Sequence, residues 1–462
     1  MTSVFSQSNV RTEIREFLRL AIPLASAQVT QLAIGFVDTV IMGHLGRETL
    51  AAGALAAMTF FALVVTASGV VMGVSALAAE AYGAGQKTRV EQVTRQGFWL
   101  SLFLAIPMMF LIGHIDLFMR QLGQAATTVT LANVYLDIML WGFFPALGFA
   151  MLRGVVSALS HARPVMVIVI AGTLFNIVGN YVLGFGKFGF PRMELAGLAL
   201  ASVLTFWGMF LALVVYILKH KQLRTYHLFQ NLYRMKPRIL WELVRIGVPI
   251  GVFSALEIGL FTVVTYLMGI LGTDVLAAHQ IVFQTINLIF MVPLGMSYAT
   301  TARVGQWRGQ KNLEGVRRAG YVSISIGAGF MALMTIVLLL FPQQVIRLYI
   351  DIRNPENATI LALGIPMLTA AAVAQIFDGM QKTAYGALQG LQDTRIPMLL
   401  SFLTYWCIGL TSGCLLGFHL GLGGTGLWLG LSIGVAITSG VFTWRFRNLT
   451  SKGSVAKTGN GL

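Results

Sequence analysis

Charged residues are scarce in this chain of 462 amino acids. Asp, Glu, Lys and Arg make up only 11% of it, whereas hydrophobic residues make up 56% and the mean hydropathy is +0.77. Soluble domains carry roughly 25% charged residues. The shortage of charge therefore excludes an ordinary soluble protein and indicates an integral membrane protein.

Cysteines and common catalytic motifs are also scarce. Cys407 and Cys414 are seven residues apart, which is about 10 Å along a helix and too far for a disulfide. No P-loop or HExxH motif is present, so ATP-driven transport and metal-dependent proteolysis have no residues to perform them. The N-terminal segment has no apolar core followed by a cleavage site, and we expect no cleaved signal peptide. We expect neither an enzyme nor a resident cofactor.

Long apolar runs cover nearly the whole chain. A transmembrane helix needs about 20 apolar residues, and no soluble domain fits between the runs that meet this length. The predicted spans are 17–43, 53–79, 97–118, 127–156, 164–186, 194–218, 239–270, 276–302, 319–343, 359–388, 396–420 and 425–446. The pattern predicts an all-α integral membrane protein with twelve transmembrane helices.

Lys and Arg outnumber Asp and Glu by 32 to 17, and they lie mostly in alternate loops. The side shared by both termini carries 26 of the 32 basic residues, and basic residues favour the cytoplasmic side. We expect a multi-pass protein of the inner (plasma) membrane with both termini in the cytoplasm. The basic loop at 219–238 is expected to face anionic membrane lipid, not nucleic acid.

The two halves of the chain resemble each other at an offset of 226 residues. RLAIPLASAQVTQLAIG, from Arg19, aligns with RIGVPIGVFSALEIGLF, from Arg245. Six spans separate equivalent points, so the halves share one orientation and form a parallel repeat. We therefore expect two pseudo-symmetric six-helix bundles. The predicted divisions are an N-terminal lobe at 1–218, a basic cytoplasmic linker at 219–238, a C-terminal lobe at 239–450 and a disordered tail at 451–462.

Pro23 and Pro249 occupy matching positions in the two halves, and we expect each to lie four to six residues into its helix. A proline inside a helix removes one backbone hydrogen bond and bends the helix. Two interpretations remain open. One is a static kink near a helix start, and the other is a hinge whose bend differs between transport states.

Most of the 17 acids lie in loops or near helix ends, and three do not, namely Asp38, Glu257 and Asp378. A carboxylate at the centre of a bilayer costs about 2.5–3.5 kcal/mol on insertion scales. Such groups face a cavity or a partner, and they tend to mark ion or proton pathways. The alternative is a buried acid that only cross-links helices.

The surroundings of these acids differ. Glu257 has no other charged residue within eleven positions on either side, so burial without a cationic partner is expected to favour its protonated or ion-bound form. Asp378 has Lys382 four residues later, at the spacing of a helix salt bridge. Gln31 aligns with Glu257 and lies seven residues before Asp38, where it is expected to support cation binding. We expect Glu257 to be the main cation site, followed by Asp38 and then Asp378.

Several motifs spread along nearly the whole chain carry a resemblance to a known family. They are GFVDTVIMGHLG (35–46), EAYGAGQ (80–86), ARPVM (162–166), NIVGNYVLGFG (176–186), EIGLFTVV (257–264), LAAHQI (276–281) and GLQDTRIPM (390–398). The chain resembles the multidrug and toxic compound extrusion (MATE) transporters, and its acids resemble those of the NorM-type bacterial branch. The resemblance implies a MATE/MOP-type transporter fold and a secondary antiporter that expels amphipathic, often cationic compounds in exchange for inward Na⁺ or H⁺ by alternating access.

The resemblance also implies roles for individual residues. The acids that couple transport to cations on helices 1, 7 and 10 fall on Asp38, Glu257 and Asp378, with Na⁺ binding implied at the last two. The asparagine of the N-lobe polar cluster falls on Asn176. Asn180 stands where the DinF-type branch carries an aspartate, which argues against a DinF-type proton site.

Three function classes remain open. A drug antiporter would act on small-molecule drugs and organic cations as a monomer, with Na⁺ and H⁺ both open as the coupling ion. A lipid-linked-precursor flippase of the same superfamily would need a more cationic central cavity, and a membrane enzyme or receptor would need a catalytic constellation. Lys382 departs from the family pattern and is expected to neutralise part of the charge of Asp378.

Overall fold

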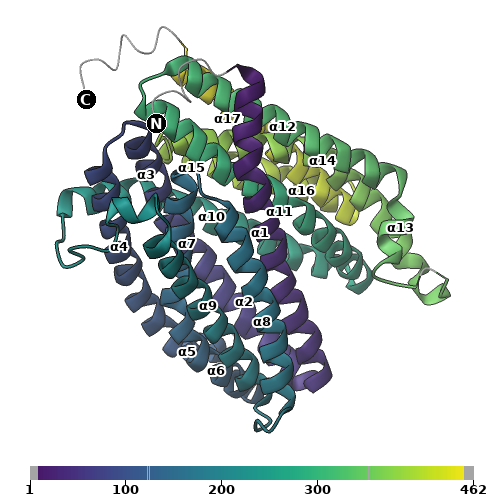
Figure 1. Cartoon of the computed structure of the whole chain (residues 1–462). Coiled ribbons are helices and arrows are strands. Elements are labelled where there is room, and N and C mark those ends of the chain that lie inside the picture. The colour runs from purple at the N-terminus through teal and green to yellow at the C-terminus, as the bar shows by residue number, and fades with distance from the viewer. Residues whose placement is uncertain (1–8, 122, 124, 352, 452–462) are drawn as a thin grey trace. The chain divides into compact units, whose positions relative to one another are not determined.

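The computed structural model describes residues 9–121, 123, 125–351 and 353–451, and these are almost entirely helical (Figure 1). No strand occurs among the residues in these ranges. Within the same ranges, twelve helical stretches are long and apolar enough to cross a membrane, which confirms the twelve predicted spans. Each predicted apolar run overlaps one of them, because the apolar run is the part of the helix that crosses the lipid.

The first six spans are α1 (Val10–Leu45), α2 (Arg47–Val71) with α3 (Gly73–Gly83), α4 (Lys87–Gly113), α6 (Ala126–Met139) with η1 (Leu140–Gly142) and α7 (Phe143–Ala158), α8 (Arg163–Phe185) and α9 (Glu194–Lys219). The short α5 (Ile115–Gln121) lies between the third span and the fourth. The short η2 (Leu223–Tyr226) follows the sixth span. The last six are α10 (Pro237–Leu271), α11 (Thr273–Gly309), α12 (Leu313–Leu340), η3 (Pro355–Asn357) with α14 (Ala358–Gly390), α15 (Arg395–Ser401) with η4 (Phe402–Leu410), α16 (Thr411–Cys414) and η5 (Leu415–His419), and α17 (Gly423–Leu449). The short α13 (Pro342–Arg347) lies between the ninth span and the tenth.

The chain divides into two compact units, and both boundaries fall inside helices. One unit runs from Ser26 to Val252, and the other joins the residues up to Ala25 to those from Phe253 onward. Each unit has its own hydrophobic core. The first half of α1 therefore packs with the second half of the chain, and the first half of α10 packs with the first.

Both helix prolines lie deeper in their helices than the apolar runs predict. α1 begins at Val10 and α10 at Pro237, so Pro23 and Pro249 lie more than three turns from the helix start. The prediction of four to six residues was wrong because polar turns such as RTEIREF continue the helix beyond the lipid. The unit boundaries follow these prolines by two and three residues.

Glycines bring two helical spans close together in the unit that contains residues 253–451. A Cβ atom at Gly430 of α17 would lie 2.1 Å from the backbone nitrogen of Gly413, and one at Gly434 would lie 3.1 Å from the Cα of Gly409. Small residues four apart allow such close backbone contact in membranes. The glycines thus fix α17 against the span that runs from Arg395 to His419.

The basic connection between α9 and α10 is held against α4 by side-chain hydrogen bonds. Arg95 Nε donates to the carbonyl oxygen of Gln230 at 3.1 Å, and Gln96 Nε2 donates to that of Arg234 at 3.1 Å. Trp99 Nε1 donates to the carbonyl of Leu232 at 2.8 Å. These bonds satisfy backbone carbonyl groups of the linker that have no partner within a helix, so the linker follows a defined path.

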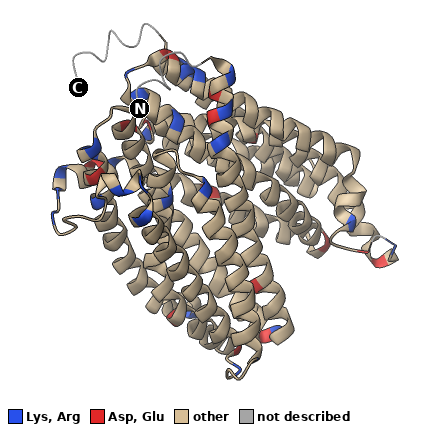
Figure 2. Cartoon of the chain, in the orientation of Figure 1, with Lys and Arg blue, Asp and Glu red and all other residues tan. Residues whose placement is uncertain are grey.

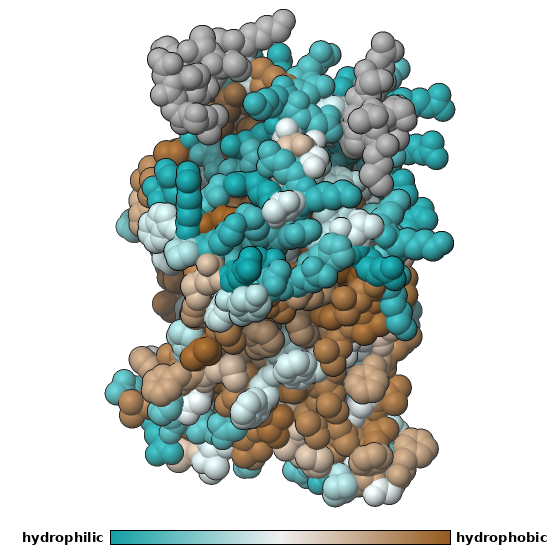
Figure 3. Space-filling view, turned by 60° about the vertical axis from the view of Figure 1, so that its left-hand side comes forward, coloured by the Kyte–Doolittle hydropathy of each residue, from teal (hydrophilic) through white to brown (hydrophobic). Residues whose placement is uncertain are grey.

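The surface has the two zones expected of a membrane protein. Figure 3 shows hydrophilic residues gathered over one end of the face in view, and hydrophobic residues over much of the rest. Phe36, Met58 and Tyr266 are each at least 70% exposed, as lipid contact allows. In Figure 2, Lys and Arg mark one end of the helices in residues 26–252, around the α3–α4 turn and the linker.

Candidate cation sites

Asp38, Asn176 and Asn180 form one buried polar cluster in the unit that contains residues 26–252. Asn180 Nδ2 lies 2.5 Å from Asp38 Oδ1 and 3.0 Å from Asn176 Oδ1. Asn176 Nδ2 donates in turn to Ser202 Oγ at 3.1 Å. α1, α8 and α9 each contribute to the cluster, so three helices position a carboxylate that only neutral amides contact in the hydrogen bonds described.

Gln31 does not join this cluster by any hydrogen bond among the described residues. It is half-buried on α1, while Gln28, one turn earlier, is buried and accepts a hydrogen bond from Arg153 Nη1 at 2.7 Å. Sequence reasoning missed the Gln28–Arg153 pair. The signal was present, because Arg153 falls inside a predicted span where a cation needs a partner.

Glu257 has a cationic partner, contrary to the prediction. Lys382 Nζ lies 2.7 Å from Glu257 Oε2, and the lysine side chain is only 3% exposed against 20% for the glutamate. The expectation of an unpaired acid was wrong because α14 brings a lysine 125 positions away beside α10. The indole of Trp406 also donates to the carbonyl of Leu256 at 3.2 Å, which fixes α10 next to this pair.

Aromatic rings surround the ammonium group of Lys382. Its Nζ lies 5.0 Å from the ring centre of Phe253 and 4.7 Å from that of Phe290. The Phe253 ring stacks on Tyr385 with centres 4.1 Å apart. A cation within about 6 Å of a ring face is attracted by the ring's electrons, so one carboxylate and two rings form a site complementary to an organic cation.

Asp378 has a different setting from the one predicted. No hydrogen bond or ion pair of its carboxylate appears among the described residues, and Lys382 bonds Glu257 instead. The i, i+4 spacing placed the lysine near Asp378 but did not decide which acid it contacts. Asp378 is half-buried, and it remains a deep carboxylate whose charge no direct contact offsets. Within the described residues, no three His, Cys, Asp or Glu side chains gather as metal ligands.

One further buried acid, Glu13, was not singled out by the sequence analysis. Glu13 is fully buried and accepts hydrogen bonds from Arg303 Nε at 2.8 Å, Arg303 Nη2 at 2.7 Å and Trp307 Nε1 at 3.0 Å. The pairing is bidentate and charge-assisted. It attaches the first half of α1 to α11, so Glu13 is a structural acid.

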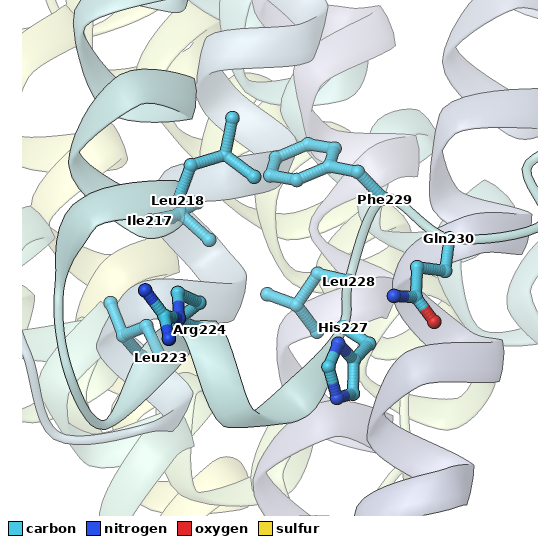
Figure 4. Close-up of a pocket in the computed structure, with 8 residues that line it drawn as sticks. All are labelled: Ile217, Leu218, Leu223, Arg224, His227, Leu228, Phe229 and Gln230. Atoms are coloured by element: carbon cyan, nitrogen blue, oxygen red, sulfur yellow. The ribbon is translucent and has the colours of Figure 1, made fainter.

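A pocket of about 360 Å³ lies where α9 passes into η2 (Figure 4). Leu218 and Phe229 line one side of it, and Arg224 and His227 line the other. Its lining residues all lie between 217 and 230. None of the deep acids contributes, so the pocket is separate from the candidate cation sites.

Sequence comparison relates the chain to known transporters along nearly its whole length. The family model MatE matches residues 23–182 and 249–414. A probable multidrug resistance protein NorM from Synechocystis sp. is 53% identical over 449 residues, covering 97% of each chain. The multidrug resistance protein NorM of Burkholderia vietnamiensis is 39% identical over 434 residues, covering 94% of this chain and 93% of that protein.

Solved structures support the same fold. A MOP superfamily transporter from Pyrococcus furiosus superposes with a TM-score of 0.87 at 22% identity, covering 96% of this chain and 97% of that one. The family match and these relatives show a multi-pass membrane transporter rather than an enzyme. The chain belongs to the MATE family, as its sequence motifs predict.

Proposed function

We propose that this chain is a multidrug efflux antiporter of the NorM type, which exports amphipathic, often cationic small molecules in exchange for inward Na⁺ or H⁺. The names of its relatives support multidrug export. The observation that carries the exchange is the site at Glu257, where a deep carboxylate and two aromatic rings already hold an ammonium group. If the lysine ammonium leaves, the same carboxylate and rings can bind a mobile cation in its place.

Glu257, Asp378 and Asp38 are the proposed coupling acids, and Na⁺ or H⁺ binds at Glu257 and Asp378. Asn176 and Asn180 support Asp38 through the hydrogen bonds of their cluster. The half-buried Gln31 is retained as a proposed supporting residue on α1. An inward-moving cation neutralises a deep carboxylate and thereby weakens the hold on a cationic substrate.

Coupling requires that each ligand distinguish the two states of the transporter. A ligand with equal affinity for the inward-open and outward-open states shifts neither. Pro23 and Pro249 are proposed as the hinges, because each interrupts the backbone hydrogen bonds of a helix that passes from one compact unit into the other. We further propose a monomer in the inner (plasma) membrane, with both termini cytoplasmic and the basic linker against anionic lipid.

Expression in a host that lacks its own drug pumps tests this function. Cells with the chain are expected to accumulate less ethidium and to survive higher ethidium or fluoroquinolone concentrations than cells with the empty vector. Unchanged accumulation and sensitivity over a broad panel of organic cations, with the protein present in the membrane, would contradict multidrug export.

A further inference from the structure

Lys382 occupies the cation site as part of the protein itself. Its ammonium group lies 2.7 Å from the Glu257 carboxylate and under 5.1 Å from the ring centres of Phe253 and Phe290. These are the contacts that an alkylammonium or aromatic cation makes in a protein site. A mobile organic cation therefore reaches the same contacts only if the lysine leaves.

Asp378 is an alternative acceptor for the lysine. It lies four residues before Lys382 on α14, at the spacing where side chains of a helix meet. Within the described residues its carboxylate has no ion pair, whereas Glu257 has one. A lysine side chain is a point charge on a long flexible stem, so it can exchange Glu257 for Asp378 without movement of the backbone.

We propose that Lys382 is a tethered cation shared between Glu257 and Asp378, which leaves these two acids room for one mobile cation at a time. The inference rests on the proposed function. Two carboxylates and one ammonium carry a net charge of minus one, so a single monovalent cation completes neutrality. Binding of a second would bring excess positive charge into a membrane-spanning site, which is costly.

The lysine then makes the two mobile cations mutually exclusive. When H⁺ or Na⁺ occupies Asp378, Lys382 stays on Glu257 and excludes the substrate. When Asp378 is vacant, Lys382 moves to it, and Glu257 with the two rings accepts the organic cation. Glu257 acts electrostatically on the phenols of Tyr385 and Tyr405, and phenols are neutral near pH 7.

Ethidium binding to the full-length purified chain in lipid nanodiscs tests the proposal. Its dissociation constant is measured by fluorescence at several pH values and with sodium chloride replacing potassium chloride. In the wild type, the coupling ion is expected to weaken ethidium binding about tenfold. In Lys382→Met, which keeps the length and removes the charge, ethidium should bind about tenfold tighter, and the ion should no longer compete.

Lys382→Arg is the matched control, because it keeps the positive charge and should keep the competition. If Lys382→Met binds ethidium with wild-type affinity, and the coupling ion weakens that binding as in the wild type, the proposed role of the lysine is wrong. A second measurement needs no variant at all. Ethidium binding to the wild type should release one proton or one sodium ion, and binding without any release would also overturn the proposal.

These measurements distinguish an error in the role of Lys382 from an error in the proposed export of organic cations. If the wild type binds and exports organic cations but Lys382→Met behaves identically, only the tethered cation is wrong. If the wild type neither binds nor exports any organic cation, both proposals are wrong.

Discussion

At the scale of single residues, the two deep sites stabilise their carboxylates in different ways. Asp38 accepts a hydrogen bond from the neutral side-chain amide of Asn180, whereas Glu257 forms an ion pair with the ammonium group of Lys382. An amide offsets part of the desolvation cost but leaves the negative charge, and an ammonium group cancels the charge. In the proposed function, Asp38 keeps its negative charge for a mobile cation, whereas Glu257 accepts one only after its lysine leaves.

His220 gives a pH-dependent prediction outside the spans. Burial lowers the pKa of His220 below its ordinary value of 6.5, and the His161 ring, 4.9 Å away, lowers it further. The folded state therefore prefers the neutral ring, so its stabilising contribution is complete above about pH 6.5 and is lost as the pH falls.

NMR titration of the His220 ring should accordingly give a midpoint below 6.5. His161→Ala removes the repulsive neighbour and should move that midpoint upward. A midpoint at or above the ordinary value in the wild type would contradict the prediction.

The acids in the spans could be found from the sequence, but their partners could not. Asp38, Glu257 and Asp378 stand out because a charge in an apolar run is costly. Lys382 was assigned to the wrong acid because local spacing shows only neighbours on one helix. Its actual partner depends on how α10 and α14 pack. Glu13 was missed because the polar segment around it gives no sign of burial.

At the scale of helices, close glycine contacts fix the last two spans against each other. Gly430→Ala is expected to destabilise the protein by about 1–3 kcal/mol, because its Cβ would overlap the backbone of Gly413. The melting temperature of the purified protein measures this. Gly440→Ala is the matched control on the same helix, since no atom lies within 4 Å of its Cβ position. Equal melting temperatures for the two variants would show that the contact is not tight.

The first half of α1 depends on its buried ion pair with α11. Glu13→Gln leaves Arg303 buried without a carboxylate, and breaking such a pair costs about 3–5 kcal/mol. We expect a melting temperature several degrees below that of the wild type. Glu16→Gln should have almost no effect, because its pair with Arg19 is long, at 4.0 Å, and the arginine is exposed. A Glu13 variant as stable as the Glu16 variant would disprove this role.

The helices could be predicted better than their ends. Lipid requires about 20 apolar residues in every spanning helix, so hydropathy finds all twelve. It does not show where a helix stops beyond the lipid, which is why Pro23 and Pro249 lie deeper than expected. The unit boundaries inside α1 and α10 had no local signal except these prolines.

At the scale of the whole molecule, the chain divides into two units that each have a core of their own. Each unit contains at least one deep acid with a polar partner. Asp38 lies in one unit, and Glu257 and Asp378 lie in the other. We propose that these acids hold mobile cations and do not serve only to cross-link helices.

Efflux of an organic cation from proteoliposomes tests this central claim most directly. An inward sodium gradient at fixed pH, and separately an inward proton gradient at fixed sodium, are imposed on vesicles that contain wild type, Glu257→Gln or Glu194→Gln. Glu194 is an exposed acid paired with Arg192 and serves as the matched control. One of the two gradients should drive efflux by the wild type and the control, and Glu257→Gln should abolish it. Gradient-driven efflux by Glu257→Gln at the wild-type rate would contradict the account.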